Sequence, residues 1–280
     1  AGNESERSET VLGMPVAPGP TPVAGDIEVD TTWYAGASPY IIEQRVLIKD
    51  KARLTIEPGT EIRSKSGALV IEGQIEASGT KENLIVFTAA EEGKVWDGII
   101  FSNTKEKENH LQYLRISQAK TAITSQASSP RIEDSEITGN LTALKIEGAF
   151  SMPFVARNVI HKNMGDAVVI IDGAKPSLTG NTITDNLKAG IFIEAAAPII
   201  KKNMIVRNQG TGVKIHKSTA DVRENKIIDN KPLEMQADRA GESVNALDNW
   251  WGSVNGIDIL ARISGKINIS SILDGETGNS

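Results

Sequence analysis

Four titratable side chains recur about every 22 residues in the second half of the chain, where they could do acid–base chemistry. With one glutamine they form a predicted outward column: Glu147, Asp172, Glu194, His216 and Gln236. If the repeats stack like paired strands, carboxylates on successive units lie ~5 Å apart and those on alternate units ~10 Å apart. These separations bracket those of retaining and inverting glycosidases. Crowded like charges would raise one carboxyl pKa toward that of a general acid, so Glu147, Asp172 and Glu194 are the candidate catalytic residues.

A second predicted outward column runs beside the first and consists of Lys145, Ile170, Phe192, Lys214 and Glu234. An outward aromatic ring such as Phe192 could stack on a sugar ring. The candidate ligand-binding residues are therefore Lys145, Phe192, Glu194, Lys214 and His216. Two alternatives stay open. The carboxylates could hold Ca²⁺ through oxygen ligands, the one cofactor considered, or they form a solvated acidic stripe that the lysines screen.

The elements that position these columns are set by an internal repeat. Its anchor positions are Pro130, Pro153, Pro176, Pro198 and Ala220, at spacings of 23, 23, 22 and 22 residues. Asparagine follows five residues after the last four anchors, at Asn158, Asn181, Asn203 and Asn225. It follows ten residues after all five, at Asn140, Asn163, Asn186, Asn208 and Asn230. We interpret both sets as structural ladders, because asparagine tolerates left-handed turns and stacked amides can hydrogen-bond to one another.

Apolar positions keep the same period. Seven residues after each anchor stand Ile137, Ile160, Ile183, Ile205 and Ile227. Three short strands in a unit of about 22 residues predict an all-β parallel β-helix, a solenoid of roughly ten coils in which such residues form inward columns. A leucine-rich repeat has a similar period, but this chain lacks its leucine frame.

Composition limits the function. The 280 residues include no cysteine, which excludes disulfides, thiolate metal sites and cysteine nucleophiles. The formal net charge of −6 argues against a nucleic-acid partner. No apolar run approaches the ~20 residues of a transmembrane segment. With only 4% aromatic residues, the core must be aliphatic.

The chain divides into three predicted segments. Residues 1–26 form a Pro- and Gly-rich tail or linker, expected to be disordered or extended. Residues 27–272 form a single β-helix domain, with a capping region at about 27–45 and a C-terminal closure at about 244–272. Residues 273–280 form a polar tail. A start at Ala1 fits either a removed export signal or a trimmed chain, and an N-terminal lipid anchor is compatible with it.

Several motifs carry a family resemblance. The order LTIEPGT (54–60), ALVIEG (68–73), ASGT (77–80), IVFT (85–88) and WDGI (96–99) resembles the opening coils of bacterial extracytoplasmic right-handed parallel β-helix repeat proteins. The later Asn-x-Ile-x-x-Asn units resemble the carbohydrate-associated β-helix repeats of that group. The segment 248–252 resembles the NWWG element that closes such domains, which implies a cap at Trp250 and Trp251. The resemblance implies a right-handed solenoid in a periplasmic, cell-surface or secreted protein.

The motifs of the pectin-degrading enzymes of this fold do not occur. The chain has no Asp-Asp pair, and its three histidines lie outside Ser-His-Gly or Gly-His-Gly contexts. The leading hypothesis is therefore a non-catalytic exported β-helix protein, a structural or interaction module that binds polysaccharide or a protein partner in a surface assembly. The alternative is a polysaccharide lyase or glycoside hydrolase that uses the carboxylate column.

Overall fold

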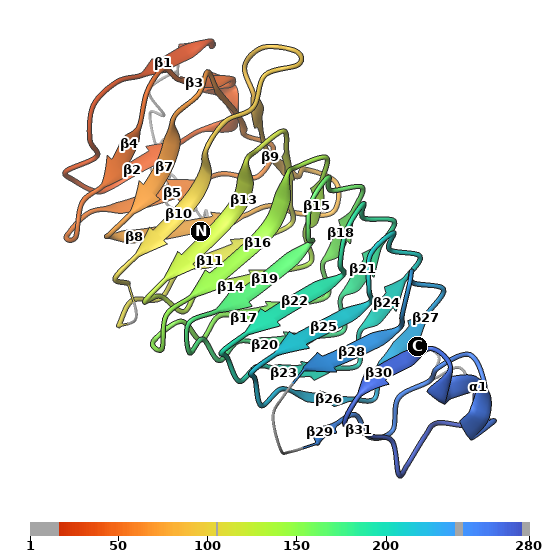
Figure 1. The fold of residues 1–280 in the computed structure, drawn as a ribbon. Helices are drawn as coiled ribbons and strands as arrows, with labels where there is room; N and C mark the ends of the chain where they lie inside the picture. The colour runs from red at the N-terminus through yellow and green to blue at the C-terminus, as the bar shows by residue number, and fades with distance from the viewer. Residues whose placement is uncertain (1–16, 105, 239–242, 276–280) are drawn as a thin grey trace, which may run out of the picture.

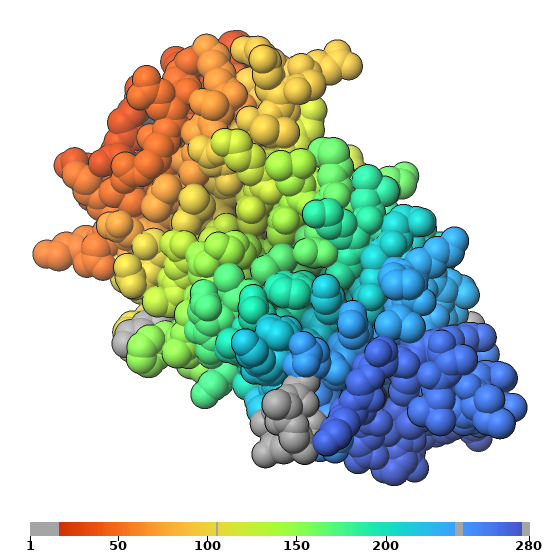
Figure 2. Space-filling model, in the orientation of Figure 1, coloured from red at the N-terminus to blue at the C-terminus, as the bar shows by residue number. Residues whose placement is uncertain are grey.

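A computed structural model describes residues 17–104, 106–238 and 243–275, and in it the chain winds into a right-handed parallel β-helix. The solenoid has about 11 turns and almost no helix, which confirms the predicted all-β fold of roughly ten coils. Figure 1 shows the coils following one another along the long axis, and the surface in Figure 2 has the same order from red to blue.

Each coil contributes one strand to each of three parallel sheets, in the order C, A, B. Sheet A comprises β1 (Thr21–Val23), β3 (Tyr40–Ile42), β6 (Glu61–Ser64), β9 (Ile85–Ala89), β12 (Leu114–Ser117), β15 (Glu136–Thr138), β18 (Val159–His161), β21 (Thr182–Thr184), β24 (Met204–Val206) and β27 (Lys226–Ile228). Sheet B comprises β4 (Val46–Ile48), β7 (Ala68–Ile71), β10 (Gly98–Ser102), β13 (Thr121–Gln126), β16 (Thr142–Glu147), β19 (Val168–Ile171), β22 (Ile191–Glu194), β25 (Val213–His216), β28 (Met235–Asp238) and β30 (Ile263–Gly265).

Sheet C comprises β2 (Thr31–Trp33), β5 (Arg53–Ile56), β8 (Gln74–Ser78), β11 (His110–Gln112), β14 (Arg131–Glu133), β17 (Phe154–Ala156), β20 (Ser177–Thr179), β23 (Ile199–Lys201) and β26 (Asp221–Arg223). The remaining elements are the 3₁₀ turn η1 (Ala35–Ala37), the pair β29 (Val244–Asn245) and β31 (Ile267–Asn268), and the short helix α1 (Gly256–Leu260). Helix α1 lies at the C-terminal end of the solenoid (Figure 1).

The core consists of stacked aliphatic columns. Ile137, Ile160, Ile183, Ile205 and Ile227 are fully buried and pair coil to coil along sheet A. The same β-branched shape therefore packs on itself at the strand spacing, which the pleated surface favours.

Two asparagine ladders run along the corners on either side of sheet A. In each, the side-chain carbonyl of one asparagine accepts hydrogen bonds from the backbone N–H and the side-chain amide of the asparagine one coil earlier. Asn158, for example, donates both to Asn181 Oδ1 at 3.0 Å. The asparagines do not occupy the left-handed conformation themselves, contrary to the sequence interpretation. The residue before each one does, as with Arg157 at φ 56° and Lys162 at φ 54°.

The two ladders end differently. The first continues beyond the predicted positions, because Asn225 donates to Asn249 Oδ1 at 2.9 Å. The second ends at Glu234, whose Oε2 accepts from the backbone and side-chain nitrogens of Asn230 at 3.1 and 2.8 Å. A carboxylate thus takes the place of the next asparagine.

The solenoid begins earlier than predicted. β1 lies inside the expected tail of residues 1–26 and pairs with β3. The tail was predicted from its proline and glycine content, but an edge strand tolerates a proline such as Pro22. Residues 1–16, which hold most of the predicted tail, lie outside the described residues. In the predicted polar tail 273–280, Leu273 donates to Asn249 O, and residues 276–280 are not described.

Aromatic rings lie near both ends. Trp33 stacks on Tyr40 with ring centroids 4.9 Å apart, and both are buried. Trp251 is fully buried, whereas Trp250 is half-buried. Trp250 forms an isolated parallel bridge with Lys226 in β27, the last strand of sheet A.

Replacing a ladder asparagine should cost far more stability than replacing its outward neighbour. Asn181→Ala removes the acceptor for two buried donors of Asn158 and should lower the free energy of unfolding by about 2–5 kcal/mol. Thr182→Ala, on the outward face, should change it by less than about 0.5 kcal/mol. Urea denaturation followed by circular dichroism measures both, and equal midpoints for the two variants would contradict the ladder's role.

Candidate functional site

The predicted carboxylate column lies on the outward face of sheet B, but its membership differs from the prediction. The register pairs Glu147 with Ile171, Ile171 with Glu194, Glu194 with His216 and His216 with Asp238. Asp172 is therefore not in the column. It follows β19 and has a left-handed backbone at φ 56°. Gln236 belongs to the neighbouring column.

The neighbouring column is corrected in the same way and consists of Lys145, Val169, Phe192, Lys214 and Gln236. Ile170, predicted to point outward, is fully buried, and Glu234 is buried before β28 begins. The first error is a one-residue shift, which exchanges the two faces of a strand. The second is a two-residue shift, which keeps Gln236 on the outward face but moves it to the other column. In the run 168–171 all four side chains are apolar, so alternation alone could not set the phase.

Glu147 is held by its neighbours as an ionised carboxylate. It accepts hydrogen bonds from Lys145 Nζ at 2.6 Å and from Gln126 Nε2 at 2.5 Å. Burial alone would raise the pKa of Glu147, but these two hydrogen bonds outweigh it and leave the pKa below its usual value. The predicted upward shift from stacked like charges is wrong for this residue, because Ile171 separates Glu147 from Glu194.

Four of the predicted ligand-binding residues meet on β22 and β25. Lys214 Nζ lies 5.9 Å from the centre of the Phe192 ring. His216 Nε2 lies 3.9 Å from Glu194 Oε1, and its Nδ1 lies 3.0 Å from Asp238 Oδ2. We call Phe192, Glu194, Lys214, His216 and Asp238 the sheet B patch. Lys145, two coils earlier, pairs with Glu147 instead.

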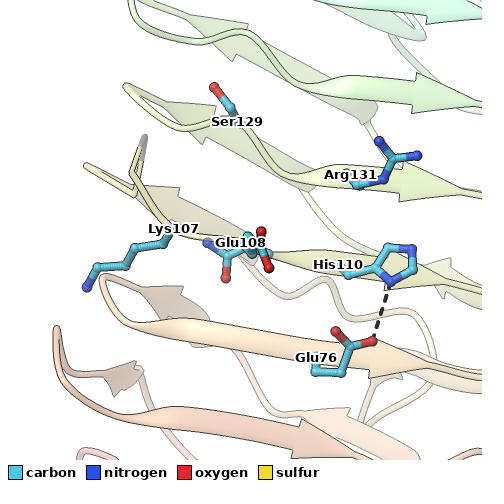
Figure 3. A pocket seen from close by; sticks show the side chains of 7 residues that line it. Glu76, Lys107, Glu108, His110, Ser129 and Arg131 are labelled. Carbon is cyan, nitrogen blue, oxygen red and sulfur yellow. Dashed lines mark ion pairs between the residues drawn. The ribbon is translucent and has the colours of Figure 1, made fainter.

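Sheet C carries a pocket that sequence reasoning missed. It has a volume of about 420 Å³ and is lined by Glu76, Lys107, Glu108, Asn109, His110, Ser129 and Arg131. Figure 3 shows that these residues come from three neighbouring coils, with Glu76 on β8, His110 on β11 and Arg131 on β14. We call this the sheet C pocket.

The His110 ring lies between two carboxylates on neighbouring coils. Nδ1 is 3.4 Å from Glu76 Oε1, and Nε2 is 3.4 Å from Glu133 Oε2. The second contact has no hydrogen-bond geometry, so Nε2 is buried without a hydrogen-bond partner among the described residues. Ser78 donates its hydroxyl hydrogen to Glu76 and holds that carboxylate in place.

Arginines neutralise the acids beside the pocket. Glu133 is 5% exposed and accepts from Arg131 and Arg157, each at 2.9 Å. Burial alone would raise the pKa of Glu133, but the two guanidinium groups lower it overall. Arg131 also lies 4.5 Å above the centre of the Phe154 ring, a cation–π contact.

The same pairing recurs over the surface. The pKa lies below its usual value for seven described carboxyls that each pair with a lysine or arginine: Glu28, Asp50, Glu133, Asp134, Glu136, Glu147 and Asp185. Glu234 is the opposite case. Its burial raises the pKa, and the hydrogen bonds from Asn230 offset that only in part.

Within residues 17–104, 106–238 and 243–275, no group of three or more His, Asp or Glu side chains is arranged to hold a metal ion. No helix in those same ranges has the length and apolar character needed to cross a bilayer.

Comparison with known proteins bears on the fold. A family model described as right handed beta helix region matches residues 97–260, more than half of the chain. No curated protein sequence matches the chain. Among solved structures, the periplasmic alginate epimerase AlgG is similar at 12% identity over 83% of this chain and 76% of that one, with a TM-score of 0.43. A mutant of AlgG matches at 13% identity over 83% and 70%, with a TM-score of 0.42. At these values the two structures carry no argument about chemistry.

The contribution of Glu234 to the free energy of unfolding should fall as pH rises. Because its folded pKa is raised, its contribution is fully present below the unfolded pKa and is lost as pH rises through the folded pKa. Glu234→Gln keeps the acceptor for Asn230 and removes the buried charge. The variant should match the wild type at acid pH and melt at a higher temperature at pH 7–8.

The control for this measurement is Glu82→Gln. Glu82 is an exposed residue in the connection before β9. Thermal melts of the three proteins across the pH range isolate Glu234, since the other carboxyls contribute equally to each. A difference between wild type and Glu234→Gln that stays constant with pH would contradict the assignment.

Proposed function

The chain belongs to the right handed beta helix region family, and we propose that it is a non-catalytic binding module whose sheet B patch binds polysaccharide. The observation that carries the proposal is the electrostatic state of its surface carboxyls. Glycosidic-bond cleavage needs a protonated carboxyl as general acid, and such groups have a raised pKa. In the described part of the chain, the partly exposed carboxyls of Asp134, Glu136 and Glu147 pair with a lysine or arginine, and this pairing holds each pKa below its usual value.

Glu147 illustrates the consequence for the catalytic alternative. Burial would raise the pKa of this predicted catalytic residue, but hydrogen bonds from Lys145 and Gln126 outweigh burial and hold the pKa below its usual value, so it is ionised at neutral pH. Asp172 lies outside the column, so a pair on successive coils does not form. Glu147 and Glu194 are two coils apart, ~10 Å by the strand spacing, and Ile171 lies between them.

The sheet B patch has the chemistry of a carbohydrate platform. Phe192 offers a half-buried ring face on a rigid strand, and Glu194 and His216 flank it with groups that accept and donate hydrogen bonds. Because the strands fix the side chains at the coil spacing, the patch is organised before any ligand arrives. An extracytoplasmic location belongs to the proposal and rests on the sequence resemblance.

The test combines binding with turnover. Affinity electrophoresis on a panel of neutral and acidic polysaccharides, with Ca²⁺ and with chelator, should show retardation by at least one of them. Phe192→Ala should weaken that retardation about ten-fold. Val159→Ala, which trims an exposed apolar residue on sheet A, should leave it unchanged.

The same polysaccharides should remain uncleaved on long incubation with the wild-type protein. Release of new chain ends that Glu147→Gln abolishes would establish the lyase or hydrolase alternative and contradict the proposal. Retardation that Phe192→Ala and Val159→Ala leave equally strong would remove the sheet B patch as the binding surface.

A further inference from the structure

Asn109 is the most unusual side chain in the sheet C pocket, because it is buried and half of its amide is unpartnered. It is 3% exposed, and its Oδ1 accepts from the backbone N–H of Ile75 at 2.7 Å. That hydrogen bond identifies the other end of the amide as Nδ2. Among the described residues, Nδ2 has no acceptor. A buried donor without an acceptor costs free energy, so its place in a pocket lining points to a ligand.

The Oδ1 of Asn109 serves the fold by accepting the buried backbone N–H of Ile75, but the later coils have no asparagine at this position. Asn109 O accepts the backbone N–H of Arg131, just as Pro130 O accepts that of Phe154 and Pro153 O that of Ser177. Asn109 therefore occupies the position that proline holds in later coils. Proline fills it with no donor to satisfy. The coil that carries the pocket has a polar side chain there instead.

The charges in the lining leave an excess of carboxylate. Lys107 pairs with Asp50 and also donates to Glu72 O at 2.7 Å. Arg131 pairs with Glu133. Both cations of the lining are thus engaged by groups that do not line it. Glu108, by contrast, makes no hydrogen bond or ion pair with another described residue. Glu76 contacts Ser78 and His110, and neither of these contacts brings a lysine or arginine.

We propose that the sheet C pocket binds a small polyhydroxylated amine, with its ammonium group on the carboxylates of Glu108 and Glu76 and a hydroxyl oxygen accepting from Asn109 Nδ2. An ammonium alone would leave the amide donor unsatisfied, and a neutral polyol would leave the carboxylates without a counter-charge. The volume of about 420 Å³ lies within the range of pockets that enclose small molecules. The site is separate from the sheet B patch and does not depend on its function.

The test uses glucamine and sorbitol, two linear polyols that differ by one amine in place of one hydroxyl. Isothermal titration calorimetry at pH 7 and low salt should show binding of glucamine to the full chain and at least about ten-fold weaker binding of sorbitol. Added salt should weaken glucamine binding, because a charge pair at a partly open site is screened. Equal affinity for the two polyols, or binding of neither, would overturn the proposal.

Variants then locate the site. Glu108→Gln should weaken glucamine binding about ten-fold, and Glu76→Gln should weaken it as well. Glu92→Gln makes the same charge change at an exposed turn outside the pocket and should leave binding unchanged. Melting curves of all three variants should overlay that of the wild type. An equal loss of binding in Glu92→Gln and Glu108→Gln would indicate general electrostatic attraction and contradict the pocket.

Discussion

In the regular repeat, the turns at the corners beside sheet A bury a backbone N–H that the strands do not satisfy, and the repeat depends on how that donor is met. A side-chain carbonyl from the next coil accepts it, as Asn181 does for Asn158. Because buried donors are almost always paired, a side-chain acceptor returns at the same place through the regular repeat. It is asparagine in most coils and the Ser135 hydroxyl for the backbone N–H of Leu114. The inward isoleucines and the outward columns keep the same coil-to-coil register as these acceptors.

This constraint explains why the fold could be predicted from the sequence. Positions such as Asn163 and Ile160 belong to periodic columns, and a period survives small errors in strand boundaries. The outward columns were less predictable, because their phase depends on single residues. In β19 the sequence Val168–Ile171 is apolar throughout, and only its distance from Asn163 shows that Ile170 points inward. The asparagine ladder, and not hydrophobic alternation, sets the face.

The candidate sites were even less predictable from the sequence than the outward columns. The sheet B patch could be found in part, since Phe192, Lys214 and His216 lie inside the regular repeat. The sheet C pocket could not, because its residues 107–109 belong to the connection between β10 and β11, which precedes the regular units. One signal was present in the sequence. Asn109 lies 21 residues before Pro130, close to the anchor period, and a polar residue at an anchor marks a coil that differs from its neighbours.

Because Glu234 ends the second ladder, the two ends of that ladder differ in whether the solenoid can gain a coil there by duplication. An asparagine both accepts from the coil before it and donates to the coil after it, so it can be copied without limit. A carboxylate accepts but has no hydrogen to pass on. Duplication of a coil upstream of Glu234 therefore keeps every donor paired, whereas a coil added after it would meet an acceptor-only group where it needs a donor. Glu234 therefore sets the end at which the second ladder cannot be extended by duplicating a coil.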